Sequence, residues 1–279
     1  WGVEANFGII DAQGGAAYYE MNNSRYIKYE VNTMPEGYRV VTNFSQAGRY
    51  EDYEGWERYQ TATAIMKEAF SREREISAID AINLFSRKYR HEVLGVNYFQ
   101  ENAPQYVVDQ DFIPRRITSA VVYFEGVKAG ENPIHSVMWT ALGYPVCAVA
   151  IPLLMDGKHL PKYMVARDAT AKEGKGLHCE MCDASLKIKN EWAFPLKISN
   201  GKRYVALQNI LVDNENKPAL MTCANDVETE ILSDFLPLYQ QWNAGKISDK
   251  EFWQAYDQVS SEWMKKFYEI FQPYWTNEK

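Results

Sequence analysis

The pattern of hydrophobic and polar positions changes from a strand period to a helical period within the first quarter of the chain. Residues 5–11, 16–21, 26–31 and 38–42 alternate between apolar and polar side chains, with short polar turns between the runs. Alternation of this kind predicts β-strands joined as antiparallel hairpins. A helical period follows over residues 53–71, with an aromatic and apolar face. The opening of the chain therefore predicts a β-meander followed by a helix.

The remainder repeats the sequence of strands and then helices. A helix is expected from Ser77 to about residue 89, and Ser248 with Glu251 forms a capping-box start for a later one. Together these segments predict an α+β fold whose strands meet mainly in antiparallel pairs. The other expected elements are a loop at 97–114, strands at 118–124 and 146–153, and helices at 227–244 and 248–271.

Composition and charge exclude some classes of function. The 279 residues are 46% hydrophobic and 24% charged, which is typical of a globular protein of one large or two small domains. The net charge is -7 and no basic stripe occurs, so we expect no nucleic-acid partner. No apolar run approaches the roughly 20 residues that a membrane-spanning helix needs, so no membrane span is predicted.

The four cysteines do not form a recognisable metal or redox motif. Cys179 and Cys182 form a C-x-x-C pair directly after His178, but a tetrahedral zinc site needs a second pair of ligands, and none follows. A redox pair is expected at a helix N-terminus after a strand, whereas residues 174–176 predict a loop here. Ordinary thiols or a disulfide are the expectation, with no metal and no cofactor.

A search for catalytic motifs leaves two polar clusters. The four histidines lie far apart, and no G-x-S-x-G, phosphate loop or H-E-x-x-H is present. The first cluster is residues 42–45, where Asn43 ends the expected strand at 38–42. An asparagine in this position can aim its amide NH2 at a developing oxyanion, which is worth about 3 kcal/mol in acyl transfer. The alternative is an Asx turn that closes the strand.

The second cluster opens the expected strand at 118–124. Arg115 and Arg116 precede this strand directly. An arginine at such a place can hold a carboxylate or lower the pKa of a thiol. The alternative is a pair of arginines at the surface.

Several segments resemble one enzyme family, in order along the chain. The run at 6–20 (NFGIIDAQGGAAYYE) and the run at 37–45 (GYRVVTNFS) resemble the penicillin acyltransferase-like members of the linear amide C–N hydrolases, relatives of choloylglycine hydrolase and penicillin V acylase. Residues 115–127 look like the family's later strand pair, together with Met138-Trp139, residues 142–145 and residues 151–153. The resemblance covers the chain to about residue 155 and is weak from residue 166 onward.

The resemblance implies a fold and a mechanism. The family's fold is a four-layer αββα sandwich of the N-terminal-nucleophile type. Its nucleophile is an N-terminal cysteine whose own α-amino group, with a pKa of roughly 8, is the general base. The thiolate attacks a linear amide and forms a thioester that water resolves.

The resemblance also assigns roles to residues of this chain. Asn43 matches the asparagine of the oxyanion site, and one of Arg115 and Arg116 matches the arginine beside the nucleophile, with Arg116 favoured. Phe44 and Tyr53 are aromatic residues expected to line an apolar acyl site. Substrates implied by the family are small acyl amides: N-acyl amino acids, N-acyl amines, bile-acid conjugates or penicillin-type side chains.

The chain enters the family pattern in its middle, which leads to further expectations. Trp1 cannot be the nucleophile, and none of the four cysteines has a matching context, so the cysteine is expected on an upstream segment. The chain would then be one product of maturation, in a heterodimer, or a truncated piece, and inactive alone. Residues 1–165 are expected to form the C-terminal part of the sandwich, incomplete without that segment, and 166–279 a mainly helical extension. An oligomer is expected, and a periplasmic or secreted bacterial location is compatible with the family.

Three other interpretations remain open at this stage. An acyltransferase would use the same residues and differ only in the acceptor that resolves the thioester. A non-catalytic binding or assembly module would show no thiol-dependent activity. A zinc-stabilised domain would hold metal through Cys179 and Cys182.

Overall fold

The first sheet is an antiparallel meander, as its alternation predicts. The computed structural model describes residues 6–21, 24–46, 54–71, 76–98, 103–167, 178–215 and 217–275. The first sheet has the order β1-β2-β3. The turn between its first two strands is closed by Asp11, whose Oδ1 accepts hydrogen bonds from the backbone N–H of Gln13 (2.9 Å) and Gly15 (2.8 Å). Its strands are β1 (Asn6–Ile10), β2 (Ala16–Met21) and β3 (Tyr26–Glu30).

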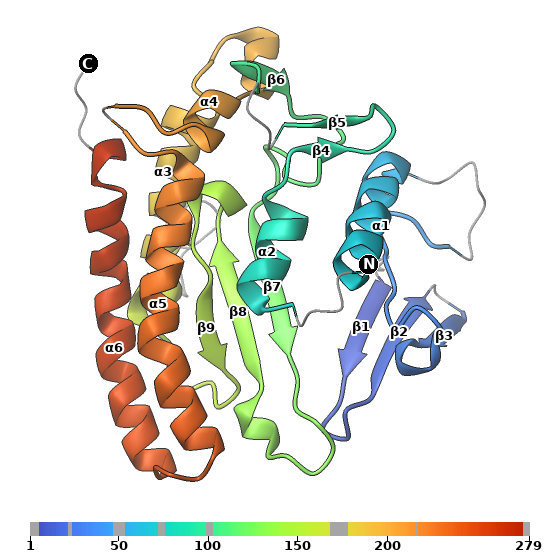
Figure 1. Ribbon diagram of the computed structural model, residues 1–279, viewed down its shortest axis with the longest axis vertical. Helices are drawn as coiled ribbons and strands as arrows, with labels where there is room; N and C mark the ends of the chain where they lie inside the picture. Colours follow the sequence, from blue (N-terminus) through green and yellow to red (C-terminus); the bar gives the residue numbers. More distant parts are fainter. Residues whose placement is uncertain are drawn as a thin grey trace.

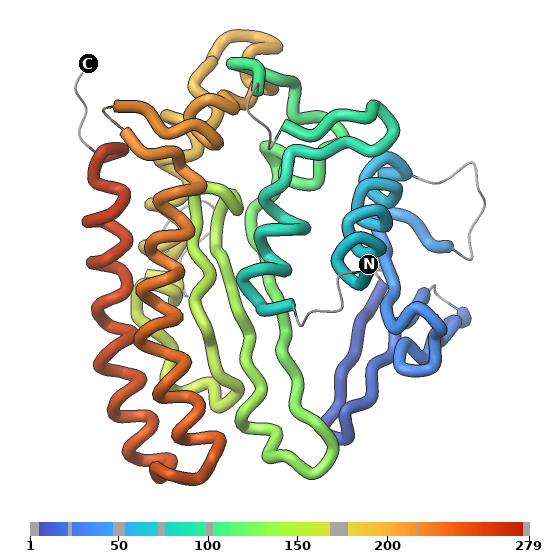
Figure 2. Tube along the Cα trace, viewed as in Figure 1, coloured from blue at the N-terminus to red at the C-terminus, as the bar shows by residue number. Residues whose placement is uncertain are grey.

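The second sheet lies at the centre of the molecule. It is antiparallel in the order β7-β8-β9, with β7 (Ala120–Glu125), β8 (Val137–Leu142) and β9 (Ile151–Leu154). Every residue of β9 is buried, whereas β7 alternates between half-buried and exposed residues. The two sheets lie next to each other with the edge strands β1 and β7 innermost (Figures 1 and 2).

Two long C-terminal helices cover one side of the second sheet. Helices α5 (Leu220–Asn243) and α6 (Asp249–Ile270) pack against each other, and α5 also contacts β9 (Figure 1). The capping box expected at Ser248 and Glu251 is present. Large aromatic side chains, among them Phe252 and Trp263, are fully buried in this layer. Burial of aromatic area of this size supplies much of the driving force for folding.

Two shorter helices lie beside α5 and next to the site, and a side-chain hydrogen bond from Asn83 to Asn225 (3.3 Å) joins the second of them to α5. They are α1 (Trp56–Phe70) and α2 (Ala78–Ser86), and α2 packs against β7. The residues that α1 buries are Arg58, Thr61, Ile65 and Ala69, so its buried stripe is offset from the aromatic face that the sequence emphasised. The remaining elements are β4 (Arg90–His91), β5 (Val96–Asn97), β6 (Tyr106–Val108), β10 (Tyr204–Ala206), α3 (Glu180–Ile188) and α4 (Leu207–Leu211).

Three of the expected elements are corrected by the structure. Residues 38–42 are extended but pair with no strand among the described residues. Residues 145–147 form a 3-10 turn, and the strand expected at 146–153 begins only at Ile151. The expected loop at 97–114 contains β6, which pairs with β10. In the second case side chains from distant segments take the hydrogen bonds that a neighbouring strand would otherwise supply.

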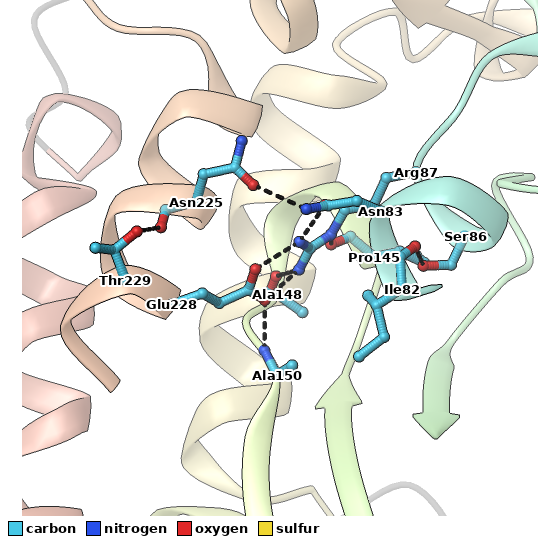
Figure 3. A network of polar contacts seen from close by, with 10 residues as sticks. All are labelled: Ile82, Asn83, Ser86, Arg87, Pro145, Ala148, Ala150, Asn225, Glu228 and Thr229. Atoms are coloured by element: carbon cyan, nitrogen blue, oxygen red, sulfur yellow. Dashed lines mark hydrogen bonds and ion pairs between the residues drawn. The ribbon is translucent and has the colours of Figure 1, made fainter. Parts of the chain in front are cut away.

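A buried ion pair explains the irregular course of the segment before β9. The Arg87 and Glu228 side chains are 0% and 1% exposed, and their two hydrogen bonds measure 2.8 and 2.6 Å. Arg87 also donates to the carbonyl oxygens of Pro145 (2.9 Å) and Ala148 (3.0 Å), and Glu228 accepts from the N–H of Ala150 (2.8 Å) (Figure 3). Backbone groups buried in this segment are thus satisfied without a strand partner. The pair also joins α2 to α5.

No helix in the described part of the chain is long and apolar enough to cross a membrane. In the same part, no group of three or more His, Cys, Asp or Glu side chains is arranged to hold a metal ion.

Candidate functional site

A buried carboxylate fixes the segment that carries Asn43. Glu20, on β2, is 4% exposed. Its Oε1 accepts from Arg39 Nη2 (3.1 Å) and from the backbone N–H of Gln46 (2.9 Å), and its Oε2 accepts from Ser45 Oγ (2.7 Å). Arg39 also lies over the Tyr29 ring, 3.5 Å from its centroid. These contacts from both ends of the segment hold residues 39–46 on the first sheet in place of a β-ladder.

Asn43 and its neighbour Phe44 have different surroundings. The Phe44 side chain is buried and contacts the rings of Trp56 and Tyr59, with centroid distances of 6.2 and 5.4 Å. Asn43 Oδ1 accepts a hydrogen bond from Arg58 Nη2. The structure therefore places Phe44 in an aromatic cluster with α1, beside Asn43, while Tyr53 lies outside the described residues.

A glycine at the start of α1 makes the contact between Asn43 and Arg58 possible. Gly55 is the N-cap of α1 and has φ 83°, a conformation that favours glycine. A Cβ atom on Gly55 would overlap the Arg58 guanidinium and would lie 3.2 Å from Asn43 Oδ1. The Gly55 carbonyl also accepts from Thr42 Oγ1 (3.3 Å). The helix start and the Asn43 segment are thus closely packed.

Asn43 lines a mainly apolar hollow of about 400 Å³, which we call the acyl hollow. Arg58 and Arg39 supply its polar wall together with Asn43. The apolar wall comes from the 40–41 segment, from α1 and α2, and from a residue before β7; its members are Val40, Val41, Ala62, Met66, Phe85 and Ile113. An apolar group of moderate size fits a space with this lining.

Arg115 and Arg116 line a second hollow of about 690 Å³, which we call the arginine hollow. Arg58 lines both hollows, so the two adjoin at its side chain. Arg203, from the turn before β10, completes the set of four guanidinium groups. Residues from four distant parts of the sequence therefore meet here, and the structure brings Asn43 and both predicted arginines to adjoining spaces.

Local hydrogen bonds set the course of the arginine pair. The backbone N–H of Arg116 donates to Asp109 Oδ2 (2.5 Å), and that of Arg115 donates to Thr118 Oγ1 (3.1 Å). Thr118 N–H donates back to the Arg115 carbonyl (2.8 Å), which closes a turn directly before β7. The turn fixes the backbone from which both guanidinium groups project.

The surroundings of the arginine pair are electropositive. Burial lowers the pKa of Arg58, and the positive charge of Arg115 lowers it further. The pKa of Lys189 is lowered in the same way, by burial and by the charge of Arg116. Both shifts show cations held close together in a partly dehydrated region.

The cysteines lie elsewhere and are not activated. Burial raises the pKa of Cys147, and burial raises that of Cys223 to about 12. Cys179 is the N-cap of α3, a helix start that the sequence did not predict, and its Sγ accepts from the N–H of Cys182 (3.4 Å). The loop expected at 174–176 lies outside the described residues. The pKa of Cys182 is raised by burial and then by Cys179. All four thiols are free, and none lines the acyl hollow or the arginine hollow.

Sequence reasoning missed Arg58, Glu20 and Gly55. Arg58 lies in the amphipathic sequence of α1. A single arginine in such a helix is normally expected to face solvent. Glu20 lies on a predicted strand, where an acidic residue is expected at a solvent-exposed position. Only Gly55 gave a local signal: it lies within the helical period expected over 53–71, and because glycine is modestly favoured at N-caps, it is compatible with a helix that begins directly after it.

Comparison with known proteins adds no assignment. No protein-family model matches the chain, and neither a curated protein nor a solved structure does. The interpretation of the site therefore depends on its geometry and on the sequence resemblance described above.

Proposed function

We propose that this chain forms part of the active site of a cysteine-dependent amidase that hydrolyses linear, non-peptide amides, with the nucleophilic cysteine on another stretch of polypeptide. The observation that supports this most directly is that Asn43, Arg115 and Arg116 line two hollows that adjoin at Arg58. An oxyanion donor, an apolar acyl site and a cationic group are the parts that attack by a thiolate on an amide requires.

Asn43 is oriented for the role of an oxyanion donor. Its Oδ1 is held by Arg58, which leaves the NH2 group as its free end. Among the described residues, no hydrogen-bond partner for Nδ2 is present. A fixed amide N–H of this kind stabilises the oxygen of a tetrahedral intermediate and contributes about 100- to 1000-fold to kcat.

The arginine pair suits the neighbourhood of a thiolate. A cation close to a cysteine lowers the pKa of its thiol and thereby raises the thiolate fraction at neutral pH. Arg116 is the preferred candidate because its charge already acts on the nearby Lys189. The acyl hollow on the other side of Arg58 would hold the apolar acyl chain. Phe44, which the sequence predicts at such a site, is instead buried against Trp56 and Tyr59 and does not line this hollow.

Two unpaired strand edges offer a place for the segment that carries the cysteine. Among the described strands, β1 pairs only with β2 and β7 only with β8. The edges of β1 and β7 face each other (Figure 1) across a hollow of about 630 Å³, which is lined by Ile9 and Ile10 on one side and Phe124 on the other. An extended peptide satisfies such edges by adding a strand. An inserted strand would also join the two sheets, in agreement with the proposed αββα sandwich.

The test uses amide hydrolysis by the purified native protein. N-acyl amino acids and N-acyl amines are the substrates, and intact mass shows whether a second polypeptide beginning with Cys is present. We expect activity that iodoacetamide abolishes, and a 100- to 1000-fold lower kcat in Asn43→Ala with little change in KM. Gln258→Ala removes an exposed amide on α6 and is the matched control. Activity that survives alkylation, or an Asn43→Ala enzyme with unchanged kcat, would refute the proposal.

A further inference from the structure

The arginine hollow holds more positive charge than its own carboxylates neutralise. Of its four guanidinium groups, only Arg58 has a carboxylate within 4 Å among the described residues, and that partner, Asp111, is 3.9 Å away. Arg203 donates to the neutral amide oxygen of Gln110. The described residues supply no ion pair to Arg115 or Arg116. Three guanidinium groups therefore surround one space without a direct counterion.

The acidic residues of the same hollow have other roles. Asp109 is 6% exposed and accepts from the backbone N–H of Arg116. Glu57 lies in the first turn of α1 and Glu54 directly before its N-cap, close to the positive end of the helix dipole, which stabilises carboxylates. Burial and Arg115 lower the pKa of Arg58 although these glutamates act in the opposite direction. The lowered pKa of Arg58 thus reflects burial first and the charge of Arg115 second.

Two guanidinium nitrogens behind the wall of the hollow have unused donors. The Nε atoms of Arg115 and Arg116 are both buried and have no hydrogen-bond partner in the described structure. A buried charged donor without a partner is unfavourable, and most native structures avoid it. A planar carboxylate matches the fork of donors on a guanidinium group, so a carboxylate bound in the hollow would pair with guanidinium charge that the described acidic residues leave without a partner.

We infer that the arginine hollow binds a carboxylate on the amine half of the substrate, so that the enzyme acts on N-acyl amino acids rather than on neutral N-acyl amines. The inference rests on the proposed function, which places the amide carbonyl at Asn43. The acyl hollow lies on one side of Arg58 and the arginine hollow on the other. With the acyl chain in the first, the group attached to the amide nitrogen extends into the second.

The test is direct binding, which requires no turnover. Isothermal titration compares an N-acylglycine with the N-acylglycinamide of the same acyl length, which differs only in its neutral end. We expect the native protein to bind the acid roughly ten- to hundredfold more tightly than the amide. The preference should decrease at high salt, because the interaction is between charges.

Two variants assign the preference to the hollow. Arg203→Met changes an exposed side chain, is expected to fold normally, and should reduce the preference at least about threefold while leaving amide binding unchanged. Arg115→Met removes a deeper cation and should reduce the preference by at least as much. Lys202→Met removes the adjacent exposed charge, which does not line the hollow, and should have no effect. Circular dichroism confirms folding.

The outcomes separate this inference from the proposed function. Equal affinity for acid and amide, or an equal loss in Lys202→Met and Arg203→Met, would overturn the carboxylate site even if amides are hydrolysed. A clear preference for the acid in a protein that hydrolyses no amide would leave the site in place and refute only the amidase.

Discussion

The buried pair of Arg87 and Glu228 offers the sharpest test of how this fold is held together. Glu228→Gln keeps the size of the side chain and removes its charge. The carboxylate accepts three hydrogen bonds, two from Arg87 and one from the N–H of Ala150, and both side chains of the pair are at most 1% exposed. The substitution therefore leaves a guanidinium group buried without a counterion.

The expected cost follows from this burial. Removing one partner of a buried ion pair destabilises a protein by about 3–5 kcal/mol. That is a large part of the roughly 5–15 kcal/mol by which native proteins are stable. The cost should be at the upper end because Gln keeps one oxygen for the Ala150 N–H and Arg87 Nη2 but turns an NH2 donor toward Arg87 Nη1, where Oε2 of Glu228 accepted.

The assay is urea unfolding followed by tryptophan fluorescence, since the chain has eight tryptophans. Glu262→Gln, an exposed position on α6, is the matched control and should change stability by less than about 0.5 kcal/mol. In a double-mutant cycle, Arg87→Met with Glu228→Gln should cost less than the sum of the single variants, by about 0.5–3 kcal/mol. A loss below about 1 kcal/mol in Glu228→Gln, or strict additivity, would show that the pair does not act as a buried unit.

Further predictions concern the site and the thiols. Glu20→Gln should weaken the clamp on residues 39–46, with faster hydrogen exchange there and a stability loss of about 1–3 kcal/mol; unchanged exchange would contradict it. Gly55→Ala should displace Arg58 and lower kcat/KM for amide hydrolysis at least about tenfold. Gly95→Ala is the control, because Gly95 also has a positive φ but a Cβ atom there would meet no neighbour. Because the pKa of Cys182 is raised, the thiolate is scarcer at any given pH than in a free thiol, and alkylation followed by mass spectrometry should show a midpoint above pH 9.0; a midpoint below it would refute the shift.

The elements that the sequence predicts correctly are those whose signals are local. The first two hairpin strands are joined by an Asx turn within five residues, and the start of α6 is set by a capping box within four. Both signals can be read without knowing the fold. Likewise, the period of the two C-terminal helices extends over many turns and is unambiguous.

The elements that the sequence predicts wrongly depend mainly on hydrogen-bond partners that are distant in sequence. The segment before β9 is continuously small and apolar, like a strand covered on both faces, yet its backbone bonds to Arg87 and Glu228, which are 141 residues apart. The 38–42 segment is held by Glu20 from an earlier strand and not by a ladder. Helix α3 follows the predicted loop at 174–176, and it is only nine residues long, too short for a clear period. A single sequence gives no means of anticipating such pairings.

In the candidate site, too, the residues with a local signal were predicted and the residue that depends on distant contacts was not. Asn43, Arg115 and Arg116 were found by their place beside expected strands and by resemblance, and the structure brings them to adjoining hollows. Arg58 joins those hollows, but nothing in its local sequence distinguishes it from a surface cation. Its role follows only from the meeting of α1 with the Asn43 segment.

The two halves of the site are positioned by different buried carboxylates, which makes their contributions separable. Glu20 holds the segment of Asn43. Glu228 and Arg87 hold the segment that follows Tyr144, whose hydroxyl is paired with that of Tyr89 and donates to the Pro114 carbonyl (3.4 Å), directly before Arg115. Glu20→Gln should therefore lower the rate of hydrolysis with little effect on carboxylate preference. A folded Glu228→Gln protein should instead lose part of that preference, and the reverse pattern would show that the two anchors have been assigned to the wrong halves.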